Sequence, residues 1–482
     1  MSTSQIRPDL LLINGLFHTQ DPGQPKVEAV AIGNGRIVAV GKSDAILSLK
    51  EKESDIVDLK GKTAIPGMID SHFHFHEWSF MRKQVDLASV NSFGECIERI
   101  SDAASSKQKG DWILGQGFNE SEWPENRMPL RSDLDAISTL HPIVIWRCDL
   151  HLAVANSVAL KIAGIEKDTP DPPEGLIEKD KQGQPTGVLR ELAINLVKES
   201  ILELMEPSII EAMKEGMPVL NALGLTGIHD IRLMGGLEGA SALKAWQVLD
   251  KQSALTLRSW VTLPGERIDE AIALGLRSGF GNDKLKIGHL KFFADGGMGA
   301  RTAYMIEPYL DAGHGMPLTS IDILEMALGK ANRNDLAVMI HGIGDRTNRE
   351  LIKLLEEVHS FTGRDEDAIP HRIEHLQMVR SEDIQRLAEM KHVVACVQPH
   401  NLVLDINMVE QSVGEKGKHV YAFRDMLDAG VQVIFSSDCP VCSPSPIVGI
   451  HAAVTRQRPD GTPREGWYPE QKVSVEEAVY AY

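Results

Sequence analysis

Cysteines are few in this sequence, and their pattern excludes one class of protein. The five are Cys96, Cys148, Cys396, Cys439 and Cys442. An odd, sparse set in a chain of 482 residues is unlike a disulfide framework and fits a reducing compartment. Cys439 and Cys442 have redox-motif spacing but lack a thioredoxin-like setting. We therefore expect a cytoplasmic protein.

Four further features are missing. The sequence has no run of about 18 apolar residues that would span a membrane, and its N-terminus has no apolar signal segment. It has 68 acidic against 50 basic residues, a formal charge of -18 and no dense Lys/Arg stripe, so no nucleic-acid partner is expected. No Gly-x-Gly-x-x-Gly or Walker loop points to a nucleotide. A small-molecule substrate remains, with a homodimer left open.

The N-terminal part of the sequence has a β pattern. Residues 9–60 contain short apolar runs, and Asn14-Gly15 and Gly33-Asn-Gly35 are hairpin signals. We predict a small β-sandwich subdomain over residues 1–62 and a barrel over residues 63–482. Residues 80–218 mix helical, strand and proline-rich segments, and we expect them to form an insertion after the first barrel strand.

Apolar strands then alternate with segments of helical period, which indicates an α/β fold. The predicted strands are residues 63–69, 223–231, 254–263, 285–293, 336–341, 373–375, 393–398 and 431–437. Four of the predicted helices are residues 322–332, 346–359, 381–390 and 421–429. Eight such units favour a closed (β/α)8 TIM-type barrel over a doubly wound sheet.

Polar side chains recur where these apolar strands end. Strand alternation after the first strand would turn Asp70, His72, His74 and His76 to one side. The other strand-end residues are Lys291, His341, His375, Gln398, His400 and Asp438. Active sites of such barrels gather at the C-terminal strand ends. Any one residue alone could be a core histidine or a surface lysine, but a shared metal centre explains them together.

Several short motifs resemble those of a known family. They are Pro66-Gly-x-Ile-Asp70-Ser-His72-x-His74, Asp149-x-His151-x-x-x-x-Asn156, Lys291-x-x-x-Asp295-Gly, Gly299-x-Arg301-Thr-Ala303, His341-x-Ile-Gly-Asp345, Arg372-Ile-Glu-His375, Gln398-Pro-His400 and Ser437-Asp438-x-Pro440-Val441. The pattern is similar to the amidohydrolase superfamily, in its amidohydrolase family 3 branch, which includes N-substituted formamide deformylase. Relatives there continue beyond the position of Tyr482, so the small sheet is expected to be incomplete without further strands.

The resemblance implies a metal-dependent hydrolase of a non-peptide C–N bond in an amide, formamide or cyclic amide. It assigns the metal ligands as His72, His74, Lys291, His341, His375 and Asp438. The expected cofactor is one or two divalent ions, with zinc the expected metal. Because a protonated amine has no lone pair, Lys291 would bridge two ions only as a carbamate, and unmodified Lys291 favours one ion.

The predicted mechanism uses a metal-activated hydroxide that attacks the carbonyl carbon. Asp438 would take the proton and pass it to the leaving amine, with His341 or His151 donating to the oxyanion. The predicted substrate-binding residues are His151, Asp295, Arg301, Gln398 and His400. Two alternatives stay open, namely an ester or lactone hydrolase on the same site and a barrel scaffold without catalysis.

Overall fold

The computed structural model describes all residues except 1–6, 149, 151, 174, 234–238 and 363–366. The chain divides into two compact units, Met1–Met68 and Ile69–Tyr482. Among the described residues, no helix is both long and apolar enough to cross a lipid bilayer.

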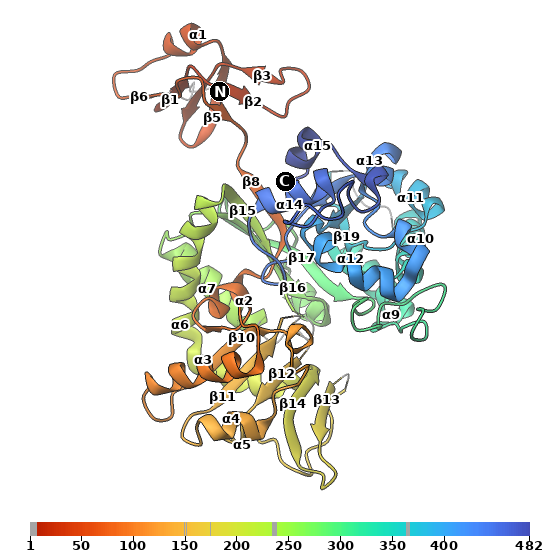
Figure 1. Ribbon diagram of the computed structural model, residues 1–482. Coiled ribbons are helices and arrows are strands. Elements are labelled where there is room, and N and C mark those ends of the chain that lie inside the picture. The colour runs from red at the N-terminus through yellow and green to blue at the C-terminus, as the bar shows by residue number, and fades with distance from the viewer. Residues whose placement is uncertain (1–6, 149, 151, 174, 234–238, 363–366) are drawn as a thin grey trace. The chain divides into compact units, whose positions relative to one another are not determined.

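The first unit contains two small sheets (Figure 1). One has the order β5-β4-β1-β6 and the other β3-β2-β7. Their strands are β1 (Leu10–Ile13), β2 (Leu16–His18), β3 (Lys26–Val27), β4 (Ala29–Gly33), β5 (Arg36–Gly41), β6 (Asp55–Asp58) and β7 (Thr63–Ala64), with helix α1 (Ser43–Leu47) between β5 and β6.

The two predicted hairpins of this unit have different outcomes. The β4–β5 hairpin is confirmed, since Gly33 pairs with Arg36 around the turn, where Asn34 and Gly35 have positive φ. The hairpin predicted at Asn14 is wrong, because β1 pairs with β4 and β6 whereas β2 pairs with β3 and β7. The chain changes sheet at Asn14, so the turn signal is real but its strands are not partners.

The second unit is organised around eight parallel strands in a nearly closed barrel (Figure 1). In chain order they are β8 (Met68–Phe73), β15 (Leu225–Asp230), β16 (Arg258–Pro264), β17 (Leu285–Phe293), β18 (Val338–Gly342), β19 (His371–His375), β20 (Val393–Val397) and β21 (Val433–Phe435). The ends of the sheet meet where Asp438 N donates to His72 O and His74 N donates to Cys439 O. The predicted fold class is confirmed.

The first barrel strand lies later in the chain than predicted. Thr63 and Ala64 pair with β2, and β8 begins only after Pro66 and Gly67. It ends at Phe73, and helix α2 (Phe75–Met81) follows at once. The predicted strand alternation therefore fails at His76, which lies in the first helical turn.

Helices follow most barrel strands. They are α6 (Asn195–Ala222), α7 (Gly239–Lys251), α8 (Ile268–Ala273), α9 (Ile321–Arg333), α10 (Asp345–Thr362), α11 (Ser381–Ala388), α12 (Pro399–Val413), α13 (Phe423–Ala429), α14 (Pro446–Thr455) and α15 (Val475–Tyr480). Buried positions on α9 recur at Leu324, Ala327, Leu328 and Ala331, the spacing of one helical face. This periodicity explains why the sequence predicted the later helices well.

A second sheet lies between β8 and α6 in the chain, with the order β13-β14-β12-β11-β10-β9. Its strands are β9 (Val85–Asp86), β10 (Ile113–Phe118), β11 (Ile143–Arg147), β12 (Leu152–Ala155), β13 (Gly175–Lys179) and β14 (Pro185–Glu191), and its helices are α3 (Phe93–Ser105), α4 (Arg131–Ile137) and α5 (Ser157–Ile162). Its own apolar cluster includes Phe118, Trp123 and Ile145. The inserted segment thus has a core of its own.

Candidate metal centre

Side chains from five barrel strands converge at the C-terminal end of the barrel. His72 lies in β8, Lys291 in β17, His341 in β18 and His375 in β19, and Asp438 follows β21. The His72 ring centroid lies 5.1 Å from that of His375, and the His341 and His375 centroids are 4.5 Å apart. The ring of His74, the residue just before α2, lies 5.2 Å from His72.

An unusual backbone conformation sets the direction of two of these side chains, those of His375 and Asp438. His375 has a φ of 70° and Asp438 a φ of 59°, both in the left-handed region that non-glycine residues rarely adopt. Strand alternation alone would send Glu374 and His375 to opposite faces. The left-handed turn at His375 ends this alternation, so Glu374 and His375 both reach His72. Such strain is typical of functional sites.

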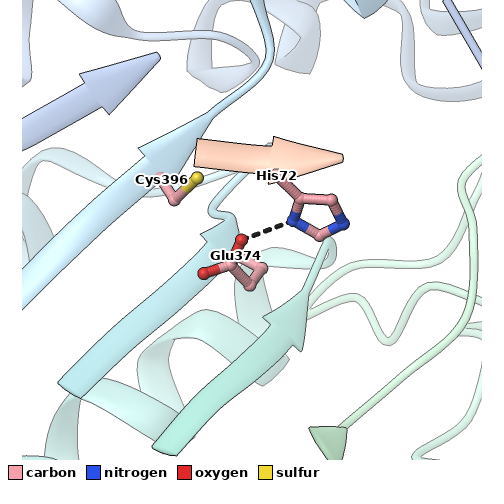
Figure 2. Close-up of side chains that lie close together, drawn as sticks. All are labelled: His72, Glu374 and Cys396. Carbon is pink, nitrogen blue, oxygen red and sulfur yellow. Dashed lines mark hydrogen bonds and ion pairs between the residues drawn. The ribbon is translucent and has the colours of Figure 1, made fainter. Parts of the chain in front are cut away.

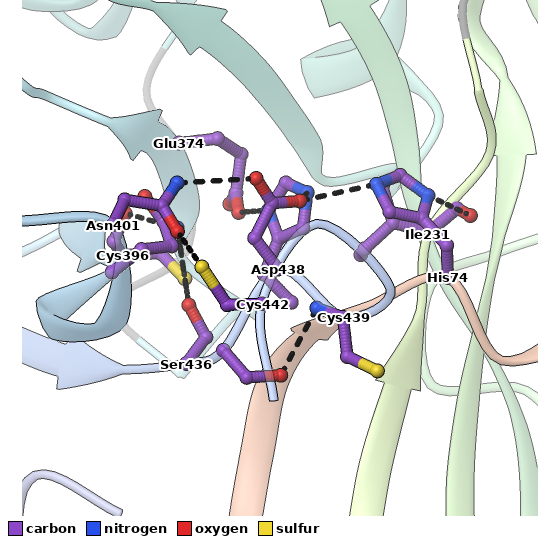
Figure 3. Close-up of polar contacts among 12 residues, drawn as sticks. His74, Ile231, Glu374, Cys396, Asn401, Ser436, Asp438, Cys439 and Cys442 are labelled. Carbon is purple, nitrogen blue, oxygen red and sulfur yellow. Dashed lines mark hydrogen bonds and ion pairs between the residues drawn. The ribbon is translucent and has the colours of Figure 1, made fainter. Parts of the chain in front are cut away.

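Asp438 lies close to two imidazoles, and Figure 3 shows it beside that of His74. Its Oδ1 atom is 3.4 Å from His72 Nε2 and 3.3 Å from His74 Nε2. Its Oδ2 atom is 3.4 Å from Asn401 Nδ2, which donates to it. All three acidic or imidazole side chains are at least nine-tenths buried.

The opposite nitrogen of each imidazole has an acceptor. His72 Nδ1 lies 2.5 Å from Glu374 Oε2 (Figure 2), and His74 Nδ1 lies 3.0 Å from the carbonyl oxygen of Ile231 (Figure 3). A carbonyl or ionised carboxylate cannot donate, so each Nδ1 carries the proton and each Nε2 presents a lone pair. Two lone pairs therefore face the Asp438 carboxylate.

This donor set fits a divalent cation. Ligand atoms of His72, His74 and Asp438 lie within 4.8 Å of one another. Two imidazole lone pairs and a carboxylate oxygen repel one another in a buried site unless a positive charge lies between them. Imidazole and carboxylate ligands suit zinc and its neighbours.

A second group, His72, Glu374 and Cys396, has the same compactness but not the same chemistry (Figure 2). Arg372 Nε donates to Glu374 Oε1 at 2.7 Å and Arg372 Nη2 to Oε2 at 3.0 Å. Burial raises the pKa of the Cys396 thiol, so it stays protonated. The guanidinium beside Glu374 repels a cation. We therefore interpret Glu374 as the residue that orients the His72 ring through its Nδ1 atom.

Burial holds three of the histidines, His72, His341 and His375, neutral. It lowers the pKa of His72 to about 3 and that of His375 to about 4, and the positive charge of Lys291 adds to both effects. Burial likewise moves the pKa of His341 well below its usual value. Neutral imidazole is the form that binds metal.

Lys291 is the unusual group of this cluster. Its side chain is 2% exposed, and its Nζ makes no hydrogen bond within the described residues. Burial lowers its pKa to about 8, against the opposing pull of the Glu374 and Asp438 carboxylates. A neutral amine is thus accessible near neutral pH, which is the form that can react with CO₂.

A cavity of about 160 Å³ opens above these groups. The cluster forms one side of it, and apolar side chains of the inserted segment and the strand ends form much of the rest. The apolar lining residues are Trp146, Leu150, Leu192, Ile194, Leu233, Phe293 and Val441. The described polar residues outside the cluster are Glu77, Glu191, Asn195 and Lys198.

The sequence pattern of the amidohydrolase family matches residues 55–482. The chain belongs to this family. The protein LONG AFTER FAR-RED 3 of Arabidopsis thaliana is 32% identical over 483 residues, which cover 98% of this chain and 82% of that protein. N-substituted formamide deformylase of Arthrobacter pascens is 27% identical over 497 residues, covering 98% and 88% of the two chains.

A solved structure gives the same result for the fold. An uncharacterised metal-dependent hydrolase from Pyrococcus horikoshii matches with a TM-score of 0.81 and 28% identity, over 98% of this chain and 91% of that one. The predicted resemblance is confirmed. The amidohydrolase family and this metal-dependent neighbour support a hydrolase with a small-molecule substrate.

The residues predicted to bind substrate in this amidohydrolase fall in different places. Asp295 accepts hydrogen bonds from the backbone amides of Tyr304, Ile343 and Gly344 at 2.8–3.0 Å. Arg301 forms an ion pair with Asp311 at 2.9 Å. These contacts hold loops together, and neither residue lines the cavity.

Two further candidates also have protein partners. Gln398 Nε2 donates to Ser436 Oγ at 3.0 Å, and His400 Nε2 lies 2.9 Å from the carbonyl oxygen of Ser445. Both are buried and neither lines the cavity. His151 lies outside the described residues.

Sequence reasoning gave no role to several residues that shape this site. Glu374 stood inside a quoted motif, but its hydrogen bond with His72 joins residues 302 positions apart, so no spacing in the sequence points to it. Asp230 accepts from the Phe75 amide at 2.8 Å and from Trp246 Nε1 at 2.6 Å, so it fixes the start of α2. Glu77 was also missed, although it lies only three residues after His74 and lines the same cavity.

Proposed function

We propose that this member of the amidohydrolase family is a divalent-metal hydrolase of a non-peptide C–N bond, in an amide, a formamide or a cyclic amide. One water is consumed, the C–N bond breaks, and a carboxylic acid and an amine form. The observation that carries the proposal is the convergence of two imidazole lone pairs on the Asp438 carboxylate. The formamide member of the class is supported by the deformylase relative.

The proposed ligands are His72, His74, His341, His375 and Asp438, with Lys291 joining them only as a carbamate. We propose zinc, as one ion beside unmodified Lys291 or two ions beside the carbamate. When bound, the metal supplies Lewis acidity and an activated water. Of the two roles proposed for His341, ligand and oxyanion donor, its 3.4 Å contact from Nε2 to the Gly296 carbonyl favours the ligand role, since Nδ1 then keeps its lone pair.

Asp438 is the proposed proton carrier. Burial alone would raise the pKa of Asp438, but the neighbouring His74, His72 and His375 side chains hold it below its ordinary value. Asp438 is therefore ionised and able to accept a proton. It would then pass this proton to the nitrogen of the leaving amine.

The test is Asp438→Asn with metal analysis and a substrate panel of matched amides, formamides, cyclic amides, esters and lactones. We expect loss of C–N hydrolysis by at least about 100-fold, the lower range of general acid–base catalysis. An Asp438→Asn protein with its metal and full activity contradicts the proton-carrier role. Turnover of esters or lactones alone favours the second candidate reaction, and purified protein that takes up no transition metal favours a scaffold.

We also propose a cytoplasmic location, supported by the five free cysteines. We propose that the protein forms a homodimer, which light scattering on the purified chain tests.

A further inference from the structure

A buried ion pair faces the cavity beside the candidate metal centre. Lys198 Nζ donates to Glu77 Oε2 at 2.6 Å, and the two side chains are only 7% and 8% exposed. Both residues line the cavity, whose other walls are mainly apolar. The pair joins α2, which follows the His72 strand, to α6, which follows the inserted sheet.

A contribution to folding stability does not by itself explain why Lys198 and Glu77 form a buried ion pair. Removing two charges from water costs several kcal/mol per ion, and apolar side chains of similar volume often serve as well. A neighbouring ion pair already links the same two segments, since Lys83 follows α2 and binds Glu215 of α6. That second pair is about half exposed and does not line the cavity.

The second oxygen of Glu77 is the atom of interest. Oε2 is taken by Lys198, whereas Oε1 accepts no hydrogen bond from the described residues and is not fully enclosed by protein. Glu77 lies in the first turn of α2, three residues after His74, and both side chains line the same cavity. A small substrate held at the His74 end of the cavity can therefore reach Glu77.

We infer that Glu77 is a specificity-determining residue that accepts a hydrogen bond from the N–H group of the substrate amide. Lys198 holds this carboxylate in place. The inference rests on the proposed function and narrows its substrate class to primary and secondary amides or formamides. Esters, lactones and N,N-disubstituted amides lack the donor, and they would leave Glu77 Oε1 facing an apolar group.

Three matched compounds test this recognition on the zinc-loaded full chain. They are N-(2-phenylethyl)formamide, its N-methyl derivative and 2-phenylethyl formate, whose apolar end suits the apolar cavity walls. Glu77→Gln should lower kcat/KM for the N–H compound by about 10- to 100-fold, the value of a hydrogen bond to a charged group. The ester and the N-methyl compound should change by less than about 3-fold, because they do not use Glu77.

Glu215→Gln is the matched control, since it removes the other ion pair between the same segments without facing the cavity. It should leave kcat/KM for all three compounds unchanged. An equal loss on all three compounds in Glu77→Gln would show a merely structural role and overturn the inference. So would wild-type protein that turns over the N-methyl compound as well as the N–H compound, a comparison that stands even if Glu77→Gln fails to fold.

The proposed function can fail separately. If wild-type protein hydrolyses none of the compounds, calorimetric binding of the same three decides the inference. Binding of the N–H compound at least about 10-fold tighter than the N-methyl compound supports it. Equal binding, or no binding of any of them, overturns it.

Discussion

Glu374→Gln is the substitution that most directly tests how the candidate metal centre is built. The wild-type carboxylate accepts from Arg372 Nε at 2.7 Å, from Arg372 Nη2 at 3.0 Å and from His72 Nδ1 at 2.5 Å. Glutamine has the same shape but presents one oxygen and one NH₂ group. Arg372 has only donors, so the NH₂ group must face either a guanidinium N–H or the His72 Nδ1 proton.

The size of the effect follows from this conflict. If the amide turns its NH₂ group to His72, the ring changes tautomer and Nε2 loses its lone pair. If it turns the other way, Arg372 loses a buried charged acceptor. Loss of such a supporting contact typically weakens metal affinity by about 10- to 100-fold, or about 1.4–2.7 kcal/mol. Breaking the buried Arg–carboxylate pair also lowers the free energy of unfolding, by about 3–5 kcal/mol.

Two measurements separate these effects. Competition with a chromogenic zinc chelator gives the zinc Kd, and urea unfolding in excess chelator gives the stability of the metal-free chain. Asp345→Asn is the control, because the buried Asp345 carboxylate also pairs with an arginine, Arg380, at 2.7 Å but makes no hydrogen bond to the candidate ligand histidines in the described chain. Both variants should lose stability, and only Glu374→Gln should lose zinc affinity. An unchanged zinc Kd in folded Glu374→Gln refutes the tautomer argument.

Further predictions concern the lysine and one close approach of the backbone. Burial lowers the pKa of Lys291 to about 8 from 10.5, so between these pH values the unfolded chain binds a proton that the folded chain lacks, and stability should rise with pH. The free energy of unfolding of the metal-free protein should thus gain up to about 3 kcal/mol across this window relative to Lys291→Met, and parallel pH profiles would contradict it. Gly344→Ala places a Cβ 2.1 Å from the Tyr304 carbonyl oxygen and should destabilise by at least about 1–3 kcal/mol in urea unfolding. Gly297→Ala meets no atom within 4 Å and should be nearly neutral.

The barrel was predictable because its strands are buried on both faces and appear as apolar runs. β20, Val393–Val397, is buried at every position and lies within the predicted segment. The first strand was misplaced, since Thr63 and Ala64 are equally strand-forming but pair with β2. Partner choice between two sheets is a property of the whole chain and leaves no local signal.

The candidate site was predictable as residue types at strand ends, and less so as contacts. His72, His341, His375 and Asp438 come together because parallel strands end at one edge of the barrel. A role for Glu374 could not be assigned from the sequence. Strand alternation predicts that Glu374 and His375 point to opposite faces, and the left-handed backbone of His375 changes this. Lys198 is 121 residues from Glu77 in the sequence, so no spacing rule connects them.

The candidate ligands lie on both sides of the place where the barrel closes. His72 and His74 come from its first strand and the residue after it, Asp438 follows its last strand, and two backbone hydrogen bonds join these ends. An ion bound by these side chains would link the first and last strands of the barrel. Part of its binding free energy would therefore stabilise the closed barrel. Zinc addition should then slow amide hydrogen exchange more where the first and last barrel strands meet than in the strands on the opposite side of the barrel.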